Sequence, residues 1–194
     1  MTVPSNQYQH LISALGRRSI VLVGMMGAGK SAVGRRLEKK IGLQFVDSDA
    51  EIVRQCGMPI PDYFKKHGEA DFRNGERRVI ASLLRNGPLL ISTGGGAFCD
   101  PATHDLICFS AITIWLKEDP KILWERLRGR SGRPMLDGPN PEGAFYQIYA
   151  HREPRYAMAD ITIEMHNRQR DKIVQEILDL AGKLVFILRA RSES

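Results

Sequence analysis

GMMGAGKS, residues 24–31, matches the phosphate-binding pattern G-x-x-x-x-G-K-[ST] and decides the expected fold. The apolar run before it, SIVLVG at residues 19–24, is typical of a buried parallel strand. After it, residues 30–41 carry apolar side chains at helical spacing and end at Gly42. A strand, a glycine-rich turn and a helix in this order predict a nucleotide phosphate site, because backbone N–H groups and the helix N-terminus both face the anion.

The side chains of this segment suit ATP and Mg²⁺. Lys30 is placed to bridge the β- and γ-phosphates, and the Ser31 hydroxyl is placed to ligate Mg²⁺. The residues expected to contact ATP here are Gly27, Ala28, Gly29, Lys30, Ser31 and Ala32.

The sequence excludes several classes of phosphate-binding protein. GTPases need a base-reading N-K-x-D element, and no such run occurs in the chain. Motors and large ATPases need partner domains that 194 residues cannot hold. Kinases of small molecules or nucleotides remain.

Apolar strand-like runs alternate with helical stretches along the rest of the chain. This alternation predicts a parallel sheet covered by helices on both faces. We expect an α/β fold with a five-stranded parallel sheet, formed by residues 19–24, 43–47, 88–93, 111–117 and 159–164. A closing amphipathic helix carries Ile173, Ile177, Leu180 and Leu184. We assign residues 19–194 to one kinase domain and residues 1–18 to a flexible extension.

Composition limits the class of protein, its compartment and its partners. The three cysteines show no C-x-x-C spacing, which argues against a disulfide framework and a zinc site. The chain has neither an apolar run of secretory length nor one long enough to span a membrane, so we expect a cytoplasmic protein. The net charge of +6 fits two kinds of partner, nucleic acid or small anions.

Polar residues follow the predicted strands where open α/β proteins bind ligands. Asp47 and Asp49 follow the second strand and suit Mg²⁺ or an attacking hydroxyl, or equally the cap of a helix. Arg73 and Glu76 are i, i+3 neighbours that could pair, or could form a solvated helix face. The glycines at 94–96 allow close approach of a ligand to the backbone, or make a plain turn.

Residues 129–143 break the alternation with four glycines, three prolines and two arginines. A long irregular loop in a compact domain is commonly functional, so we expect a mobile lid. Arg126, Arg128, Arg130 and Arg133 cluster at and inside it. They suit the charge of a transferring phosphate or, alternatively, nucleic acid; the loop has no interleaved aromatic side chains, which disfavours nucleic acid.

Together these segments resemble the shikimate kinase family. The resemblance rests on residues 29–52, on residues 57–80 with their F-R-x-x-E, on STGGGAF at 92–98 and on GRPML at 132–136. It covers about residues 19 to 185 and implies a nucleoside-monophosphate-kinase-like, three-layer fold. It also implies transfer of phosphate from ATP to the 3-hydroxyl of shikimate by a protein that we expect to be monomeric.

The resemblance implies a role for each candidate residue. Asp49 would accept a hydrogen bond from shikimate and act as base, Asp47 and Ser31 would hold Mg²⁺, and Ser92 would join the water shell of the ion. The substrate-binding residues would be Asp49, Arg73, Gly94, Gly95, Gly96 and Arg152, with Glu76 orienting Arg73. Lys30 and Arg133 would assist catalysis, and adenine would lie near Arg130 and residues 167–169, including Gln169.

Two residues depart from the family pattern: Arg155 and Met135 each stand where leucine is usual. Both lie beside the site and bear on substrate affinity rather than on the type of reaction. The alternatives kept open are a kinase for another small polyol acid, such as gluconate, and a non-catalytic regulator that binds ATP and nucleic acid.

Overall fold

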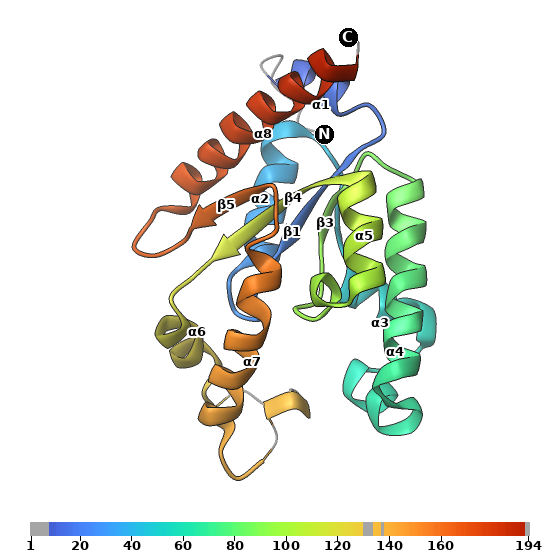
Figure 1. Ribbon diagram of the computed structural model, residues 1–194, viewed down its shortest axis with the longest axis vertical. Helices are drawn as coiled ribbons and strands as arrows, with labels where there is room; N and C mark the ends of the chain where they lie inside the picture. Colours follow the sequence, from blue (N-terminus) through green and yellow to red (C-terminus); the bar gives the residue numbers. More distant parts are fainter. Residues whose placement is uncertain (1–7, 130–133, 137, 193–194) are drawn as a thin grey trace.

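The computed structural model describes residues 8–129, 134–136 and 138–192, whose five-stranded parallel sheet has the order β2-β3-β1-β4-β5 (Figure 1). The strands are β1 (Ser19–Val23), β2 (Phe45–Asp47), β3 (Leu90–Ser92), β4 (Ala111–Lys117) and β5 (Ile161–Glu164). Each lies within the range that the sequence predicts. The predicted α/β fold is confirmed.

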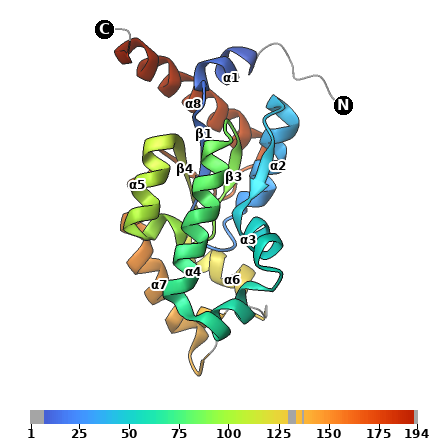
Figure 2. The same ribbon diagram turned by 90° about the vertical axis from the view of Figure 1, so that its right-hand side faces the viewer.

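Helices cover both faces of this sheet, and Figure 2 places α2 and α5 on opposite sides of the strands. On one side, α2 packs on β1 and β3 and against α8, which also contacts β5. On the other side, α5 packs on β4, with α4 beside it. The α-helices are α1 (Gln9–Leu15), α2 (Lys30–Ile41), α3 (Ser48–Cys56), α4 (Ile60–Arg85), α5 (Pro101–Ser110), α6 (Pro120–Leu127), α7 (Pro141–Tyr156) and α8 (Arg170–Ser192).

The core lies between the sheet and these helices. All five residues of β1 are buried, as expected for a central parallel strand with helices on both faces. Phe98, Phe145 and Tyr156 are among the largest fully buried side chains. The loops at the carboxyl ends of the strands thus start from a close-packed and rigid base.

The N-terminal segment differs from the expectation of a flexible extension over residues 1–18. Residues 1–7 lie outside the described residues, but Gln9–Leu15 form α1, which packs against α8. Leu11 and Leu15 are buried, and the Tyr8 hydroxyl donates to Gln175 Oε1 at 3.2 Å. The i, i+4 spacing of the two leucines is a helical signal, so treating residues 9–15 as unstructured was wrong.

The predicted lid segment, residues 129–143, is also partly regular. Its described part contains a short 3₁₀ helix, η3 (Pro134–Leu136), and the first turn of α7. Asn140 caps α7, since its side chain accepts from the Gly143 backbone N–H. Within the described part of the chain, the helices are all too short or too polar to cross a membrane.

Candidate functional site

The phosphate-binding segment joins β1 to α2 as the sequence predicts. Gly27 and Gly29 have φ values of 82° and 91°, a region that glycine enters without steric cost. The Lys30 ammonium folds back over the segment and donates to the carbonyl oxygens of Gly24 at 2.7 Å and Met25 at 3.0 Å. The positive charge is therefore held beside the turn that would surround a phosphate.

A cavity of about 410 Å³ opens over this segment. Among the residues expected to contact ATP, it is lined by Gly27, Gly29, Lys30, Ser31 and Ala32. Ala28 is fully buried and does not line it. We refer to this space as the phosphate cavity.

Asp47 connects the phosphate cavity to the start of α3. Its Oδ2 accepts from Ser31 Oγ at 2.7 Å and from Ser92 Oγ at 3.5 Å. Its Oδ1 accepts from the Asp49 backbone N–H at 3.1 Å and so caps α3. Of the interpretations left open by the sequence, the helix cap is confirmed for Asp47, the role in binding Mg²⁺ stays a prediction, and the hydrogen bond from Ser31 was not predicted.

The oxygens of Ser31 and Asp47 are of the hard type that Mg²⁺ prefers. No group of three His, Cys, Asp or Glu side chains in the described ranges could hold a metal ion without other ligands. This donor set fits Mg²⁺ as kinases commonly hold it, by one or two side chains together with substrate phosphates and water.

A second cavity, of about 400 Å³, adjoins the first. Met26, Asp49, Gly94 and Gly95 line both spaces. The polar side of the second cavity is formed by Asp49, Arg73, Glu76 and Arg152, and its apolar wall by Ile60, Pro61, Phe64, Phe72 and Met135. We refer to this space as the acceptor cavity, because its mixture of charge and apolar surface suits a small organic anion.

Asp49 lies at the junction of the two cavities. Burial raises the pKa of its carboxyl, and the nearby charge of Asp47 raises it further. The charges of Lys30 and Arg73 act in the opposite direction. A carboxylate with a raised pKa between two ligand spaces is suited to accept a proton or a strong hydrogen bond.

Arg73 is held in place by two acidic residues of its own helix, α4. Its Nη1 donates to Glu76 Oε2 at 2.6 Å and its Nη2 to Glu69 Oε1 at 3.2 Å. The Glu76 side chain is 1% exposed, and burial raises its pKa while the charge of Arg73 lowers it. The predicted pairing of Arg73 with Glu76 is present, and it faces the acceptor cavity rather than solvent.

Arg152 comes from the buried side of α7 and faces Arg73 across the glycine turn. A methyl group on Gly95 would lie 3.1 Å from Arg152 Nη1, and one on Gly96 would lie 2.4 Å from Arg73 Nη2. Arg152 Nη2 also contacts the Met135 sulfur at 3.2 Å. The glycines at 94–96 therefore leave room for the side chains around the acceptor cavity, and the plain-turn interpretation is insufficient.

Several site residues were not found from the sequence. Arg126 and Arg170 line the phosphate cavity, although neither was assigned to it. Tyr156 is buried, its pKa is raised chiefly by that burial, and its hydroxyl donates to the Gly95 carbonyl. Arg126 belongs to the arginine cluster noted in the sequence, and Tyr156 lies one turn after Arg152 on the same helix, a spacing that could have pointed to it.

Three assignments made from the family resemblance, those of Gln169, Arg130 and Arg133, stay predictions. Gln169 is exposed and does not line the phosphate cavity; its carbonyl accepts from Ile173 N at the start of α8. The neighbouring Arg170 lines the phosphate cavity, and the prediction that Gln169 lies near adenine is not tested by this. Arg130 and Arg133, expected near adenine and the transferring phosphate, lie outside the described residues.

Comparison with known proteins links this geometry to one family. A family model described as shikimate kinase matches residues 26–181. A shikimate kinase of Bradyrhizobium diazoefficiens is 49% identical over 169 residues, which are 87% of this chain and 82% of that protein. A shikimate kinase of Paramagnetospirillum magneticum is 45% identical over 169 residues, 87% of each chain.

Solved structures give the same result. A shikimate kinase from Acinetobacter baumannii in complex with shikimate superposes with a TM-score of 0.82 at 34% identity, covering 88% of this chain and 96% of that one. A gluconokinase from Sinorhizobium meliloti superposes with a TM-score of 0.62 at 22% identity, covering 91% and 98%. The second likeness concerns the fold alone.

Proposed function

The chain belongs to the shikimate kinase family, and on this premise we propose that it transfers the γ-phosphoryl group of ATP to the 3-hydroxyl of shikimate, giving shikimate 3-phosphate and ADP. One observation carries the proposal most directly. The phosphate and acceptor cavities share a wall at Met26, Asp49, Gly94 and Gly95, so two ligands would meet at Asp49. In-line transfer needs this proximity of donor and acceptor.

The acceptor would be held by its carboxylate. Arg73 and Arg152 both line the acceptor cavity, and planar guanidinium groups suit planar carboxylates. Glu76 and Glu69 fix the orientation of Arg73 before the ligand arrives. The Gly94–Gly96 backbone would lie against the ring, and the apolar wall would cover its carbon face.

Asp49 would receive the hydroxyl proton, or a hydrogen bond from that hydroxyl, as the oxygen attacks the γ-phosphorus. Its ionised form must be present for this role. Lys30, beside the phosphate segment, would neutralise the charge that spreads over the equatorial oxygens. Ser31 and Asp47 would hold Mg²⁺, which would neutralise charge on the phosphates of the nucleotide.

Arg126 and Arg170, which line the phosphate cavity, would contact the nucleotide. We retain Arg133 as the residue expected to meet the transferring phosphate, and Arg130 and Gln169 as residues expected near adenine, on the basis of the family resemblance. We also expect the protein to act as a monomer in the cytoplasm, and to bind small anions rather than nucleic acid.

The test is ADP release from Mg·ATP with shikimate, with gluconate and with no acceptor, measured side by side on the purified protein. ADP release is expected with shikimate and not with gluconate or without an acceptor. Turnover with gluconate would favour a polyol-acid kinase, and equal turnover without an acceptor would indicate an ATPase. Binding of ATP without any turnover, together with nucleic-acid binding that survives moderate salt, would support the regulator alternative.

A further inference from the structure

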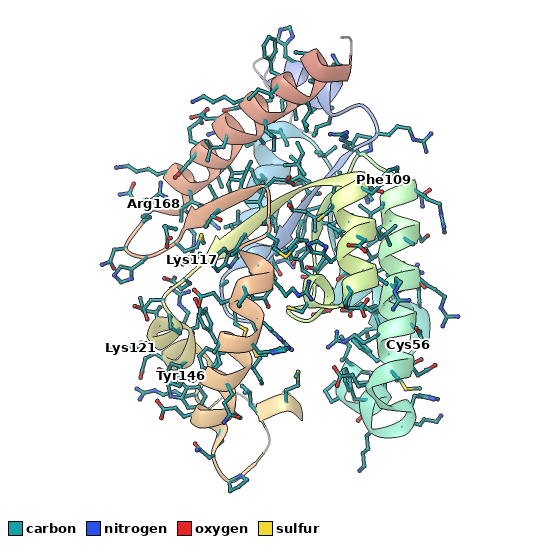
Figure 3. The ribbon with its side chains drawn as sticks, viewed as in Figure 1. Cys56, Phe109, Lys117, Lys121, Tyr146 and Arg168 are labelled. Atoms are coloured by element: carbon teal, nitrogen blue, oxygen red, sulfur yellow. The ribbon has the colours of Figure 1, made fainter. Side chains whose placement is uncertain are left out.

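Glu118 is a buried carboxylate that the proposed reaction does not use. It follows Lys117, the last residue of β4, which Figure 3 labels. The Glu118 side chain is 0% exposed. Burying an ionised carboxylate is unfavourable unless it is paired and hydrogen-bonded, so its partners indicate what it does.

The partners of Glu118 come from two separate segments. Its Oε2 accepts from Arg126 Nη2 on α6 at 2.8 Å, and its Oε1 accepts from the Asp119 backbone N–H at 3.2 Å. His166 Nδ1, in the turn between β5 and α8, lies 3.9 Å from Oε1. The carboxylate therefore connects α6 with the turn that precedes Arg170.

Arg126 carries this connection into the phosphate cavity. Its Nη2 is bound to Glu118, while its Nη1 donates to the Gly27 carbonyl at 3.2 Å. The Arg126 side chain is 36% exposed and lines the cavity. Two fixed partners hold the guanidinium at the edge of the phosphate-binding segment, where a long arginine side chain would otherwise sample many rotamers.

We propose that Glu118 is a positioning residue for the nucleotide, which acts by holding Arg126 beside the phosphate-binding segment. The inference rests on the proposed function only insofar as a nucleotide occupies the phosphate cavity. Pre-orienting Arg126 lowers the entropy lost when the nucleotide binds, so Glu118 contributes to nucleotide affinity. It has no contact with the acceptor cavity and leaves acceptor affinity unchanged.

Glu118→Gln is the main test because it keeps the shape of the side chain and removes its charge. We expect the Kd of Mg·ADP, measured by calorimetry without acceptor, to rise about tenfold, since one charge-assisted hydrogen bond is weakened. The KM of ATP should rise with it, while the KM of shikimate stays within about twofold. A role in stability alone would lower the unfolding temperature and leave the Kd of Mg·ADP unchanged, which would overturn the proposal.

Glu125→Gln is the matched control. Glu125 lies on the same helix and pairs with Arg128 at 2.7 Å, but both side chains are more than half exposed and neither lines the phosphate cavity. The same carboxylate-to-amide change there should leave the Kd of Mg·ADP at the wild-type value. An equal rise in both variants would mean that the net charge of α6, and not the Glu118–Arg126 pair, controls affinity.

Arg126→Ala and the double variant Glu118→Gln/Arg126→Ala complete the cycle. The double variant removes both partners together, so it folds without an unpaired buried charge even if a single variant does not. It should bind Mg·ADP as weakly as Arg126→Ala. Wild-type affinity in the double variant, or a further rise caused by Glu118→Gln in the absence of Arg126, would contradict the proposal. Because Mg·ADP binding is measured without acceptor, a wrong acceptor assignment would appear in turnover and not here.

Discussion

The carboxylate of Asp49 lies directly against the α-carbon of Gly94, so that a methyl group on Gly94 would be 2.6 Å from Asp49 Oδ1. The same methyl group would be 3.0 Å from Glu76 Oε1. The loop after β3 can pass between these two acidic side chains only because residue 94 has no side chain. This contact sets where Asp49 points, between the phosphate and acceptor cavities.

Replacing Gly94 by alanine should displace Asp49 and abolish most activity. A shift of about 1 Å at a reacting group can cost about a hundredfold in rate, so we expect kcat/KM for shikimate to fall by about that factor. The Kd of Mg·ADP should stay within about threefold, because the phosphate-binding segment is not displaced. Steady-state kinetics and calorimetry measure the two quantities.

Gly182→Ala is the control for the Gly94 variant. Gly182 lies in α8 with no atom within 4 Å of an added methyl group. Alanine there should keep full activity and stabilise the helix by up to about 1 kcal/mol. Full activity in Gly94→Ala would show that Asp49 does not need its observed position.

Asp49→Asn should stabilise the protein at neutral pH while removing turnover. The pKa of Asp49 is raised in the folded state, so folding binds its proton more tightly and the wild type loses stability as pH rises through that pKa. Asparagine cannot ionise and avoids this loss. Below both the unfolded and the folded pKa the two proteins should differ least, and above the folded pKa the variant should be the more stable one.

Denaturant unfolding at several pH values measures this difference. A wild type that is more stable than Asp49→Asn at neutral pH would contradict the raised pKa of Asp49 in the folded state. Turnover of the wild type should also fall as pH drops through the raised pKa, since the ionised carboxylate is the active form. The variant should still bind Mg·ADP.

Asp47→Asn and Asp47→Ala should separate the two roles of this side chain. Asparagine caps a helix about as well as aspartate, whereas alanine costs about 1 kcal/mol of stability. The asparagine side chain would keep the bond to the Asp49 backbone and lose the charge opposite Ser31. Both variants should therefore need about tenfold more Mg²⁺ for half-maximal turnover, and only Asp47→Ala should unfold more easily. Equal stability of the two variants would remove the capping role.

Arg152→Lys should weaken binding of shikimate and leave the nucleotide unaffected. Lysine keeps the charge but cannot form two parallel hydrogen bonds to a carboxylate, so the KM of shikimate should rise about tenfold or more. Arg54→Lys is the control, because Arg54 is largely exposed, pairs with Glu51 and lines neither the acceptor cavity nor the phosphate cavity. An equal rise in the KM of ATP would contradict the proposed role of Arg152 in binding the shikimate carboxylate.

Gly34→Ala should destabilise the fold without a direct effect on chemistry. Gly34 is in α2, and a methyl group there would be 2.2 Å from Phe45 Cε2 on β2. Overpacking of this kind costs about 1–3 kcal/mol, measurable by denaturant unfolding. Phe45→Leu in the same chain should recover part of the loss. Unchanged stability in Gly34→Ala would show that β2 can move away from α2.

The phosphate-binding segment and the strands that flank it could be predicted because their signals are local. Residues 24–31 carry the whole pattern, and each strand is a short apolar run of its own. Helix α2 has the predicted bounds Lys30–Ile41, with Gly42 ending it. Such elements depend on periodicity and end residues within one stretch of chain.

The contact of Asp47 with Ser31 and the places of Arg126 and Arg170 could not be predicted in this way. Each depends on a contact between segments far apart in sequence: Asp47 with Ser31, Arg126 with Gly27 and Glu118, and Arg170 with the phosphate cavity. The family resemblance predicts Arg130 and Gln169 near adenine, and this stays a prediction. The position of an arginine along the chain does not decide whether its side chain reaches the phosphate cavity.

The amino-acid sequence by itself determined the phosphate-binding segment, the class of fold and the family, because these are carried by local patterns and by several short motifs in a fixed order. Only the tertiary structure decided how the acceptor site is assembled. The acceptor cavity takes side chains from separate elements: Asp49 from α3, Arg73 from α4, Gly94 from the loop after β3 and Arg152 from α7. The sheet order β2-β3-β1 places the start of α3, which follows β2, beside the loop that follows β3. Strand order is a property of long-range packing, since any one strand can pair with several others until the whole core is buried.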